Sequence, residues 1–237
     1  MIGVIGGNGV AATNKLCQLI EEGITRNGAF RDAHHPEMLV WQATKAPSRS
    51  MYLEGRGPSW IEDYIEIGKK LKACGCTKLC MCCNTAHYAI DILEEQIGIE
   101  FLNLLDLVVE RCTLLGSVKV GMMCSDGLRK VELYDRHFKM INPAIELVYP
   151  DSNYQKLVTL GICNAKNKKR LDNKEDNQDH PYNCFAKVCN HLIHDKHVDC
   201  VVAGCTDIRN VFTYELGEAS YVDSLEVLAN EIIRQES

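Results

Sequence analysis

The stretch Lys78–His87, KLCMCCNTAH, organises the interpretation of the whole chain, together with a shorter echo at Asp199–Ile208, DCVVAGCTDI. In both, an apolar run typical of a buried strand ends at a cysteine, and small polar residues that favour helix starts follow. We expect Cys83 and Cys205 to lie at the carboxyl ends of strands, where open α/β sheets bind ligands. A helix beginning there would lower the pKa of each thiol, so the two cysteines are predicted to form a reactive pair.

The composition indicates a globular protein that acts on a small molecule. The chain has 237 residues, of which 46% are hydrophobic, enough for a substantial core. A net charge of −6, from 26 basic and 32 acidic residues, argues against nucleic acid or an anionic membrane as a partner. No apolar run approaches the ~18 residues of a membrane span, and the first residues lack the pattern of a secretory signal, so a cytoplasmic location is expected.

The thirteen cysteines are interpreted as reduced thiols, because their number is odd and many lie in strand-like segments. Five of them form a C-x-C-x3-C-x-C-C cluster: Cys74, Cys76, Cys80, Cys82 and Cys83. The cluster lacks the paired C-x2-C spacing of structural zinc sites, so no metal is predicted. Cys80 and Cys82 share one face of the expected strand and are predicted to be small core residues.

The opening sequence, MIGVIGGNGVAAT, predicts a strand, a glycine turn and a helix that extends to about residue 26. Gly6, Gly7 and Gly9 would let backbone amides approach an anion at the helix start. The full G-x-G-x-x-G fingerprint of dinucleotide-binding proteins is absent, so the turn is expected to line a carboxylate pocket.

Strands and helices are expected to alternate from this point to the end of the chain. Further strands are predicted at 34–44, 78–83, 101–105, 118–125, 145–149, 199–205 and 219–222, and helices at 59–73, 86–98, 106–115, 131–140, 150–166, 185–197 and 225–233. This order predicts an α/β fold of two pseudo-symmetric lobes, each a parallel sheet flanked by helices, with the active site in the cleft between them. Residues 1–113 plus 214–237 are assigned to the lobe of Cys83, and residues 114–213 to the lobe of Cys205.

Several charged residues outside the cysteine motifs are candidates for the same cleft or for the surface. Arg49 lies in an expected loop, where a guanidinium could hold a carboxylate in a bidentate fork, although position alone favours a solvated arginine. Lys166 borders the polar segment 164–183 and could bind a second anion at the cleft. His191, His194 and His197 are interpreted as a solvated helix face, because no further metal-ligand signature accompanies them.

The strings CNTAH at Cys83–His87 and GCTDI at Gly204–Ile208, with the opening GGNG followed by AAT, resemble the aspartate/glutamate racemase family. The resemblance extends over essentially the whole chain and is closest to the aspartate racemase branch. Glutamate racemases end the second motif with histidine, whereas this chain has Asp207; the commoner residue in the aspartate branch is glutamate.

The resemblance implies racemisation of an acidic amino acid, most closely aspartate, without a cofactor. One cysteine, as thiolate, would remove the α-proton while the other, as thiol, protonates the opposite face. Substrate-binding roles are implied for Asn8, Arg49, Asn84, Thr85, Ser125, Lys166 and Thr206, and supporting roles for His87 and Asp207. Asn8 and Leu128 depart from the usual family pattern, and relatives are commonly dimers, so a homodimer is expected.

Three other functions stay open at this point. The protein could racemise glutamate or a broader range of amino acids. It could be a hydrolase that uses Cys83 as nucleophile and His87 as base, which would leave Cys205 without a role. It could also be an amino-acid-binding homologue that has lost turnover.

Overall fold

Two four-stranded parallel sheets form the centre of the computed structural model, which describes residues 1–215 and 217–236. The first sheet contains β1 (Ile2–Gly6), β2 (Met38–Gln42), β3 (Lys78–Met81) and β4 (Phe101–Leu102), and the second contains β5 (Lys119–Met123), β6 (Glu146–Val148), β7 (Cys200–Ala203) and β8 (Ser220–Asp223). Their orders, β2-β1-β3-β4 and β6-β5-β7-β8, are the same pattern repeated. The repeat confirms the predicted pseudo-symmetric α/β fold.

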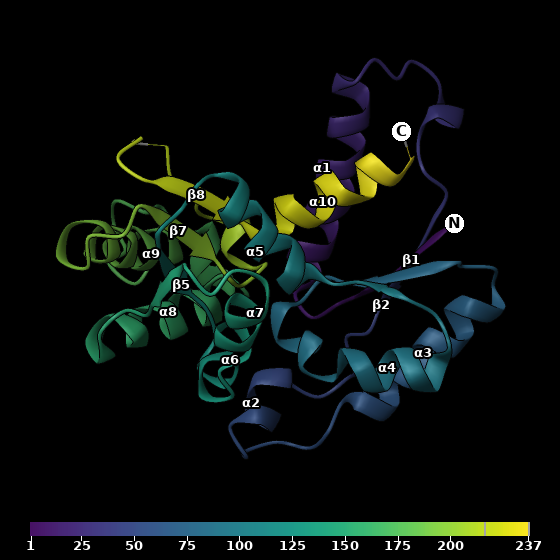
Figure 1. Ribbon diagram of the computed structural model, residues 1–237, viewed down its shortest axis with the longest axis horizontal. Helices are drawn as coiled ribbons and strands as arrows, with labels where there is room; N and C mark the ends of the chain where they lie inside the picture. The colour runs from purple at the N-terminus through teal and green to yellow at the C-terminus, as the bar shows by residue number, and fades with distance from the viewer. Residues whose placement is uncertain (216, 237) are drawn as a thin grey trace.

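Helices connect the strands and cover both sheets (Figure 1). They are α1 (Val10–Arg26), α2 (Arg49–Leu53), α3 (Ile61–Ala73), α4 (Ile90–Ile97), α5 (Leu104–Leu114), α6 (Asp126–Lys130), α7 (Leu133–Ile141), α8 (Ser152–Asn164), α9 (Pro181–Asn190) and α10 (Ser224–Glu236). Shorter turns are η1 (Asp32–His34), η2 (Asn84–Ala89), η3 (Lys168–Leu171), η4 (His191–Asp195) and η5 (Ile208–Asn210).

Local sequence accounts for several of these boundaries. The Asn103 side chain accepts hydrogen bonds from the amides of Leu105 and Asp106, which caps α5, and Ser125 caps α6 in the same way. Gly98 ends α4 in the left-handed region, with φ of 67°, where a glycine avoids the strain of a side chain. The helices therefore begin and end where short-range chemistry allows.

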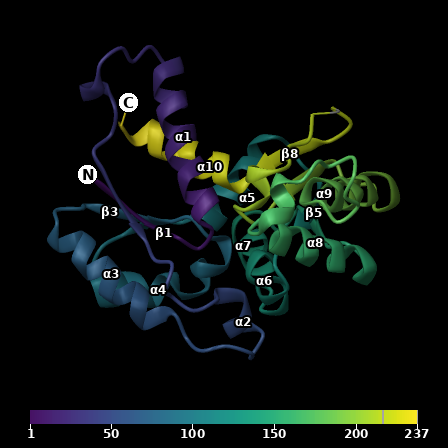
Figure 2. The ribbon, with the colours of Figure 1, turned by 180° about the vertical axis from the view of Figure 1, so that it is seen from behind.

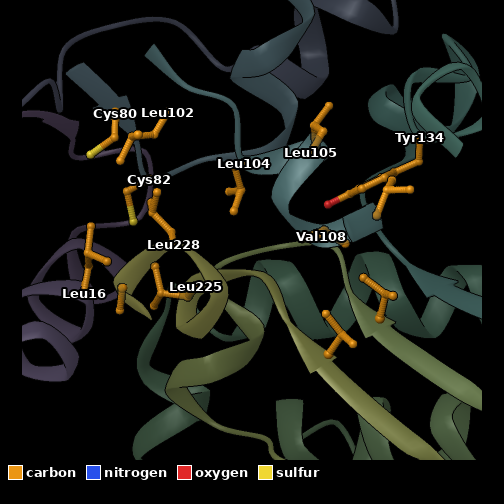
Figure 3. Close-up of a cluster of buried hydrophobic side chains, with 14 of the residues drawn as sticks. Leu16, Cys80, Cys82, Leu102, Leu104, Leu105, Val108, Tyr134, Leu225 and Leu228 are labelled. Carbon is orange, nitrogen blue, oxygen red and sulfur yellow. The ribbon is translucent and has the colours of Figure 1, made fainter. Parts of the chain in front are cut away.

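The largest hydrophobic cluster runs through both lobes. It combines Val4 and Cys80 of the first sheet with Met122 and Val202 of the second, and side chains of α1, α5, α7 and α10 complete it. Figure 3 shows Leu16, Cys82, Leu104, Leu225 and Leu228 converging from four different elements. Cys80 and Cys82 are fully buried, which confirms that they are small core residues.

The last part of the chain belongs to both lobes, which differs from the predicted division at residue 213. Strand β8 pairs with β7, so Ser220–Asp223 completes the sheet of the second lobe. Helix α10 then packs on α1 and α5, as both ribbon views show (Figures 1 and 2). The sequence pattern alone could not place β8, because a short apolar run fits the edge of either sheet.

The predicted solvated histidine face is wrong for His191. The α9 helix ends at Asn190 and continues as one π-helical turn. There, His191 is buried, its Nδ1 lies 2.7 Å from Asp195 Oδ2, and its ring stacks on Tyr154 at a centroid distance of 3.7 Å. His194 and His197 are exposed, as expected.

Within the described part of the chain, no helix is both long and apolar enough to cross a bilayer.

Candidate active site

A cavity of about 70 Å³ lies where β1, β3, β5 and β7 end, between the two lobes. Its walls contain every predicted site residue except His87, although those residues are distributed from position 8 to position 207. The lining residues are Asn8, Ser48, Arg49, Ser50, Cys83, Asn84, Thr85, Ser125, Ile162, Lys166, Cys205, Thr206 and Asp207. We call this cavity the cleft.

Cys83 and Cys205 enter the cleft from equivalent places, directly after the third strand of each lobe in chain order. Cys83 precedes η2, which continues into α4, whereas Cys205 precedes only the three-residue η5. Because the dipole of so short a turn is small, the predicted helix effect on Cys205 is absent. Burial and the charge of Asp207 instead raise the pKa of Cys205, which keeps this thiol protonated.

Arg49 faces Cys83 from the first turn of α2. The segment was predicted to be a loop, but Ser48 accepts a hydrogen bond from the amide of Met51 and so caps a short helix. Burial opposes the charge of Arg49, yet the neighbouring Cys83 sulfur is the main contribution that raises the pKa of the guanidinium. The guanidinium is thus placed to stabilise a negative charge on the Cys83 sulfur.

Asp207 and Lys166 form an ion pair beside Cys205. The Lys166 Nζ lies 2.9 Å from Asp207 Oδ2, and the Cys205 thiol lies 3.8 Å from the same carboxylate oxygen. Burial opposes the charge of Lys166, but the Asp207 carboxylate outweighs it and raises the pKa of the amine. Lys166 is therefore positively charged in the cleft, and its role in binding an anion stays a prediction.

Both cations also donate to one backbone oxygen. Arg49 Nη2 and Lys166 Nζ each lie 3.2 Å from the carbonyl oxygen of Asn8, which belongs to the glycine turn after β1. Two positive groups held so close together repel each other, and the Asp207 carboxylate balances only one of the two charges. This part of the cleft is suited to a carboxylate.

Among the residues that the structure describes, three buried polar atoms of the cleft have no hydrogen-bond partner. They are the donors Asn8 Nδ2 and Arg49 Nε and the acceptor Asp207 Oδ1. Buried polar groups are nearly always paired in folded proteins, because leaving one unpaired costs about 1–3 kcal/mol. A ligand with a carboxylate and an ammonium group would complement these atoms. Its carboxylate oxygens would accept from the two donors, and its ammonium group would donate to the acceptor.

Asn84 contributes to the cleft in a different way from the one predicted. Its side chain accepts a hydrogen bond of 2.5 Å from the Tyr134 hydroxyl and donates one of 2.9 Å to Ser224 Oγ. Both ends of the amide are thus bonded to protein groups, and these bonds fix the orientation of the side chain at the cleft. Asn84 instead joins η2 to helices α7 and α10 and is better described as a positioning residue.

The predicted hydroxyl residues bridge the two lobes. Thr85 and Ser125 lie 3.1 Å apart, oxygen to oxygen, and Thr206 donates to the carbonyl oxygen of Cys82 at 3.1 Å. The Thr206 bond joins the two strand ends that carry the cysteines, and the Thr85–Ser125 contact joins the segment after β3 to the end of β5. The Thr85 and Ser125 hydroxyls still line the cleft and can turn toward a ligand.

His87 lies outside the cleft. Its Nδ1 faces the carbonyl oxygen of Cys83 at 2.9 Å, and its Nε2 accepts from the amide of Leu104 at 3.1 Å, which requires the neutral Nδ1–H tautomer. Burial lowers the pKa of His87 to about 4. The imidazole therefore supports the backbone between η2 and α5 rather than the Cys83 sulfur.

Sequence reasoning missed two tyrosines that fix the cleft. Tyr64 and Tyr134 are fully buried, and their hydroxyls donate to Asn8 Oδ1 and Asn84 Oδ1, each at 2.5 Å. In the sequence, Tyr64 is one of several apolar residues on a helix face, so nothing distinguishes it from a core residue. Ser48, Ser50 and Ile162 of the cleft also carried no signal, because no motif surrounds them.

Within residues 1–215 and 217–236, no group of three or more His, Cys, Asp or Glu side chains is arranged to hold a metal ion.

The fold and chain length agree with those of solved racemases. A Picrophilus torridus aspartate racemase superposes with a TM-score of 0.79 at 22% identity, over 99% of this chain and 93% of that one. An aspartate racemase homologue from Pyrococcus horikoshii gives 0.71 at 18% identity, over 99% and 98% of the two chains. Francisella tularensis glutamate racemase, solved with D-glutamate, gives 0.63 at 14% identity, over 99% and 80%.

The sequence itself matches the family model for Asp/Glu/hydantoin racemases over residues 2–232, nearly the whole chain. This match includes both cysteine motifs and the glycine turn. The chain therefore belongs to the Asp/Glu/hydantoin racemase family and is an amino-acid racemase, an isomerase.

Proposed function

We propose that this protein interconverts L- and D-aspartate by two-base proton transfer between Cys83, Cys205 and the substrate α-carbon, with no cofactor. The observation that supports this most strongly is the composition of the cleft. Two cysteines from equivalent strands share a small cavity with two unpaired donors and one unpaired acceptor.

In the proposed reaction, the Cys83 thiolate accepts the proton from Cα of one enantiomer. The C–H bonding electrons move into the α-carboxylate, and the S–H proton of Cys205 is delivered to Cα from the opposite side. The protein is left with a Cys83 thiol and a Cys205 thiolate, the state that racemises the other enantiomer. Burial and the charge of Asp207 raise the pKa of Cys205 and so favour the first of these two states in the empty cleft.

The developing carbanion has to be stabilised by fixed positive groups, since the proposal includes no electron sink. Arg49 and the Asn8 amide would hold one carboxylate through donors that are unpaired in the empty cleft. Lys166 would bind the second carboxylate, and Asp207 Oδ1 would accept from the ammonium group. Arg49 Nε, Asn8 Nδ2 and Asp207 Oδ1 would thereby gain the partners that they lack in the empty cleft.

The small cavity is the reason for proposing aspartate rather than glutamate. A cavity of about 70 Å³ has to widen for either amino acid, and the extra methylene of glutamate requires more widening. Such a difference is worth about 1–3 kcal/mol in selectivity. We therefore expect aspartate to be converted faster, with glutamate as a weaker substrate.

The hydrolase alternative receives no support from the geometry. A cysteine–histidine dyad requires an imidazole nitrogen within hydrogen-bond distance of the sulfur. Both nitrogens of His87 are occupied by backbone groups, and the residue does not line the cleft.

The proposal is tested by chiral chromatography of L-aspartate, L-glutamate and L-alanine after incubation with the protein. We expect D-aspartate to form, D-glutamate to form more slowly and L-alanine to stay unchanged, because alanine lacks a second carboxylate. Failure to racemise either acidic amino acid would contradict the proposal, and faster conversion of glutamate would contradict the assignment of substrate.

A further inference from the structure

A hollow of about 720 Å³ opens beside the cleft and shares Asn8, Lys166 and Asp207 with it. Its walls come from the glycine turn, the first half of α1, and the segments around η3 and η5. The lining residues are Gly7, Asn8, Gly9, Val10, Ala11, Asn14, Lys15, Gln18, Thr44, Ala165, Lys166, Arg170, Asp207, Arg209 and Asn210. We call this hollow the vestibule. Its volume lies in the ordinary range of small-molecule sites.

The vestibule is positively charged in a chain whose net charge is −6. Its walls carry four cations, Lys15, Lys166, Arg170 and Arg209, but only one carboxylate, that of Asp207. Such a concentration of one sign in a hollow attracts ligands of the opposite sign.

Two of these cations, Lys15 and Arg170, have no carboxylate partner in the described part of the chain. Lys166 pairs with Asp207, and Arg209 pairs with Asp223 and Glu226. Lys15, by contrast, donates to the neutral Gln18, and in the described residues neither its amine nor the Arg170 guanidinium has an ion pair. Arg170 and Lys15 are therefore available to a bound anion.

Uncharged donors face the same space. Helix α1 begins at this wall after Gly9, which offers no side-chain cap, and Val10 and Ala11 of its first turn line the vestibule. A helix start with open amides favours an anion and adds to the attraction of the unneutralised cations.

The lining also indicates the chemical class of the anion. It contains no aromatic ring on which a nucleobase could stack, and its apolar side chains are limited to Val10, Ala11 and Ala165. Arginine, lysine and helix amides together match the several oxygens of a phosphate group. We propose that the vestibule binds a small phosphate-type oxyanion, at a site distinct from the amino-acid cleft.

The shared Lys166 couples the two sites. An anion in the vestibule would draw Lys166 Nζ away from Asp207, with which it now lies at 2.9 Å. The proposed substrate carboxylate needs the same amine, so the two ligands are expected to weaken each other. The site itself does not depend on the racemase reaction, since its donors are present whether or not the cysteines turn over.

Calorimetric titration of the full chain with inorganic phosphate, at constant ionic strength set with chloride, tests the site directly. Wild type should show saturable binding, and Arg170→Gln and Lys15→Gln should each weaken it about tenfold, the loss expected for one charge-assisted hydrogen bond. Lys139→Gln, at an exposed lysine of α7 that does not line the vestibule, should bind as wild type does. Glycerol 1-phosphate, as a second probe, distinguishes a phosphate ester from free phosphate as the ligand of the site. Tighter binding than phosphate assigns the site to a phosphate ester, and weaker binding assigns it to free phosphate.

Three results would overturn the proposal: no saturable binding, equal weakening by Lys139→Gln, or binding that survives Arg170→Gln but is lost in Arg49→Lys. The last would place the phosphate in the cleft. Aspartate racemisation by the Arg170→Gln and Lys15→Gln proteins, together with wild-type thermal unfolding, separates loss of the vestibule from misfolding or failure of the proposed reaction.

Discussion

Cys83 and Cys205 differ in their surroundings although they follow equivalent strands. Arg49 faces the first sulfur, whereas a carboxylate lies 3.8 Å from the second. The pseudo-symmetry of the fold brings two similar groups to one cavity, and their nearest charged neighbours are of opposite sign. In this account, Arg49 beside Cys83 and Asp207 beside Cys205 determine which cysteine begins as the base.

Asp207→Asn is expected to change the pH dependence of only one direction of the reaction. Burial and the negative charge of Asp207 raise the pKa of Cys205, and removing the charge lowers it. The direction that uses Cys205 as base should therefore reach half-maximal kcat/KM at lower pH, while the opposite direction shifts less. Initial rates from L- and D-aspartate across pH 6–10 measure this. Equal shifts in both directions, or none, would argue against the asymmetry.

His87 should make the folded protein sensitive to acid. Its pKa falls from about 6.5 in an unfolded chain to about 4 in the buried site, so the unfolded chain binds an extra proton between these values. Stability is therefore lost as the pH decreases through this window, by up to about 3 kcal/mol. Urea unfolding midpoints at pH 7 and pH 4.5 measure the loss.

The variant His87→Gln separates this effect from other titrating groups. Its stability should be lower at pH 7 but should fall less on acidification, whereas His194→Gln, at an exposed histidine, should follow wild type. An unchanged acid sensitivity in His87→Gln would show that another group is responsible.

At the scale of elements, the glycine turn before helix α1 packs closely against the loop after β7. A Cβ added at Gly9 would lie 2.1 Å from Asp207 Oδ1, although φ of −168° is open to any residue. Gly9→Ala should therefore displace Asp207 and reduce kcat/KM by about 10²-fold, as other misplacements of about 1 Å do. In an Asp207→Ala background the same change should have no further effect, since the clash is gone. An equal loss in both backgrounds would contradict this.

The sequence alone was sufficient to predict the strands that carry the site residues. Buried parallel strands appear as continuous apolar runs, so β1, β3, β5 and β7 and the cysteines after them could be predicted. Arg49 was placed in a loop because the capping role of Ser48 depends on the turn actually forming. The short turn after Cys205 and the pairing of β8 depend on long-range packing, which a local pattern does not contain.

The same limit applies to the side chains of the cleft. Motifs identified the residues that line it, but not which of them are free to bind. Asn84 is occupied by Tyr134 and Ser224, and Asn8 is left with an unpaired donor because Tyr64 takes only its oxygen. These partners lie between 50 and 140 positions away in the chain, so no spacing rule could reveal them.

For the molecule as a whole, the core shared by both sheets predicts that the lobes unfold together. Met122→Ala empties a fully buried position in the second lobe and should lower stability by about 2–5 kcal/mol. Both tryptophans, Trp41 and Trp60, lie in the first lobe, so their fluorescence should report this destabilisation in urea. Leu114→Ala, at a residue that is 80% exposed, should stay within about 0.5 kcal/mol of wild type. An unshifted tryptophan transition in Met122→Ala would show that the lobes unfold independently.

The cleft also needs the whole molecule, because each lobe supplies one cysteine and one of the two cations. Arg49 follows β2 and Lys166 follows β6, which are equivalent strands in the two sheets. Neither half contains a complete site. The expected homodimer and cytoplasmic location stay predictions from the family resemblance and the composition.

The most direct test of the central claim is the exchange of the α-proton of L-aspartate in deuterium oxide, followed by mass spectrometry of the separated enantiomers. Wild type and the exposed-cysteine control Cys163→Ala should give α-deuterated aspartate of both hands. Cys83→Ala and Cys205→Ala should each lose inversion by about 10²–10⁴-fold, the contribution of a positioned acid or base. Inversion at the wild-type rate by either single variant would contradict the two-base mechanism across one cleft.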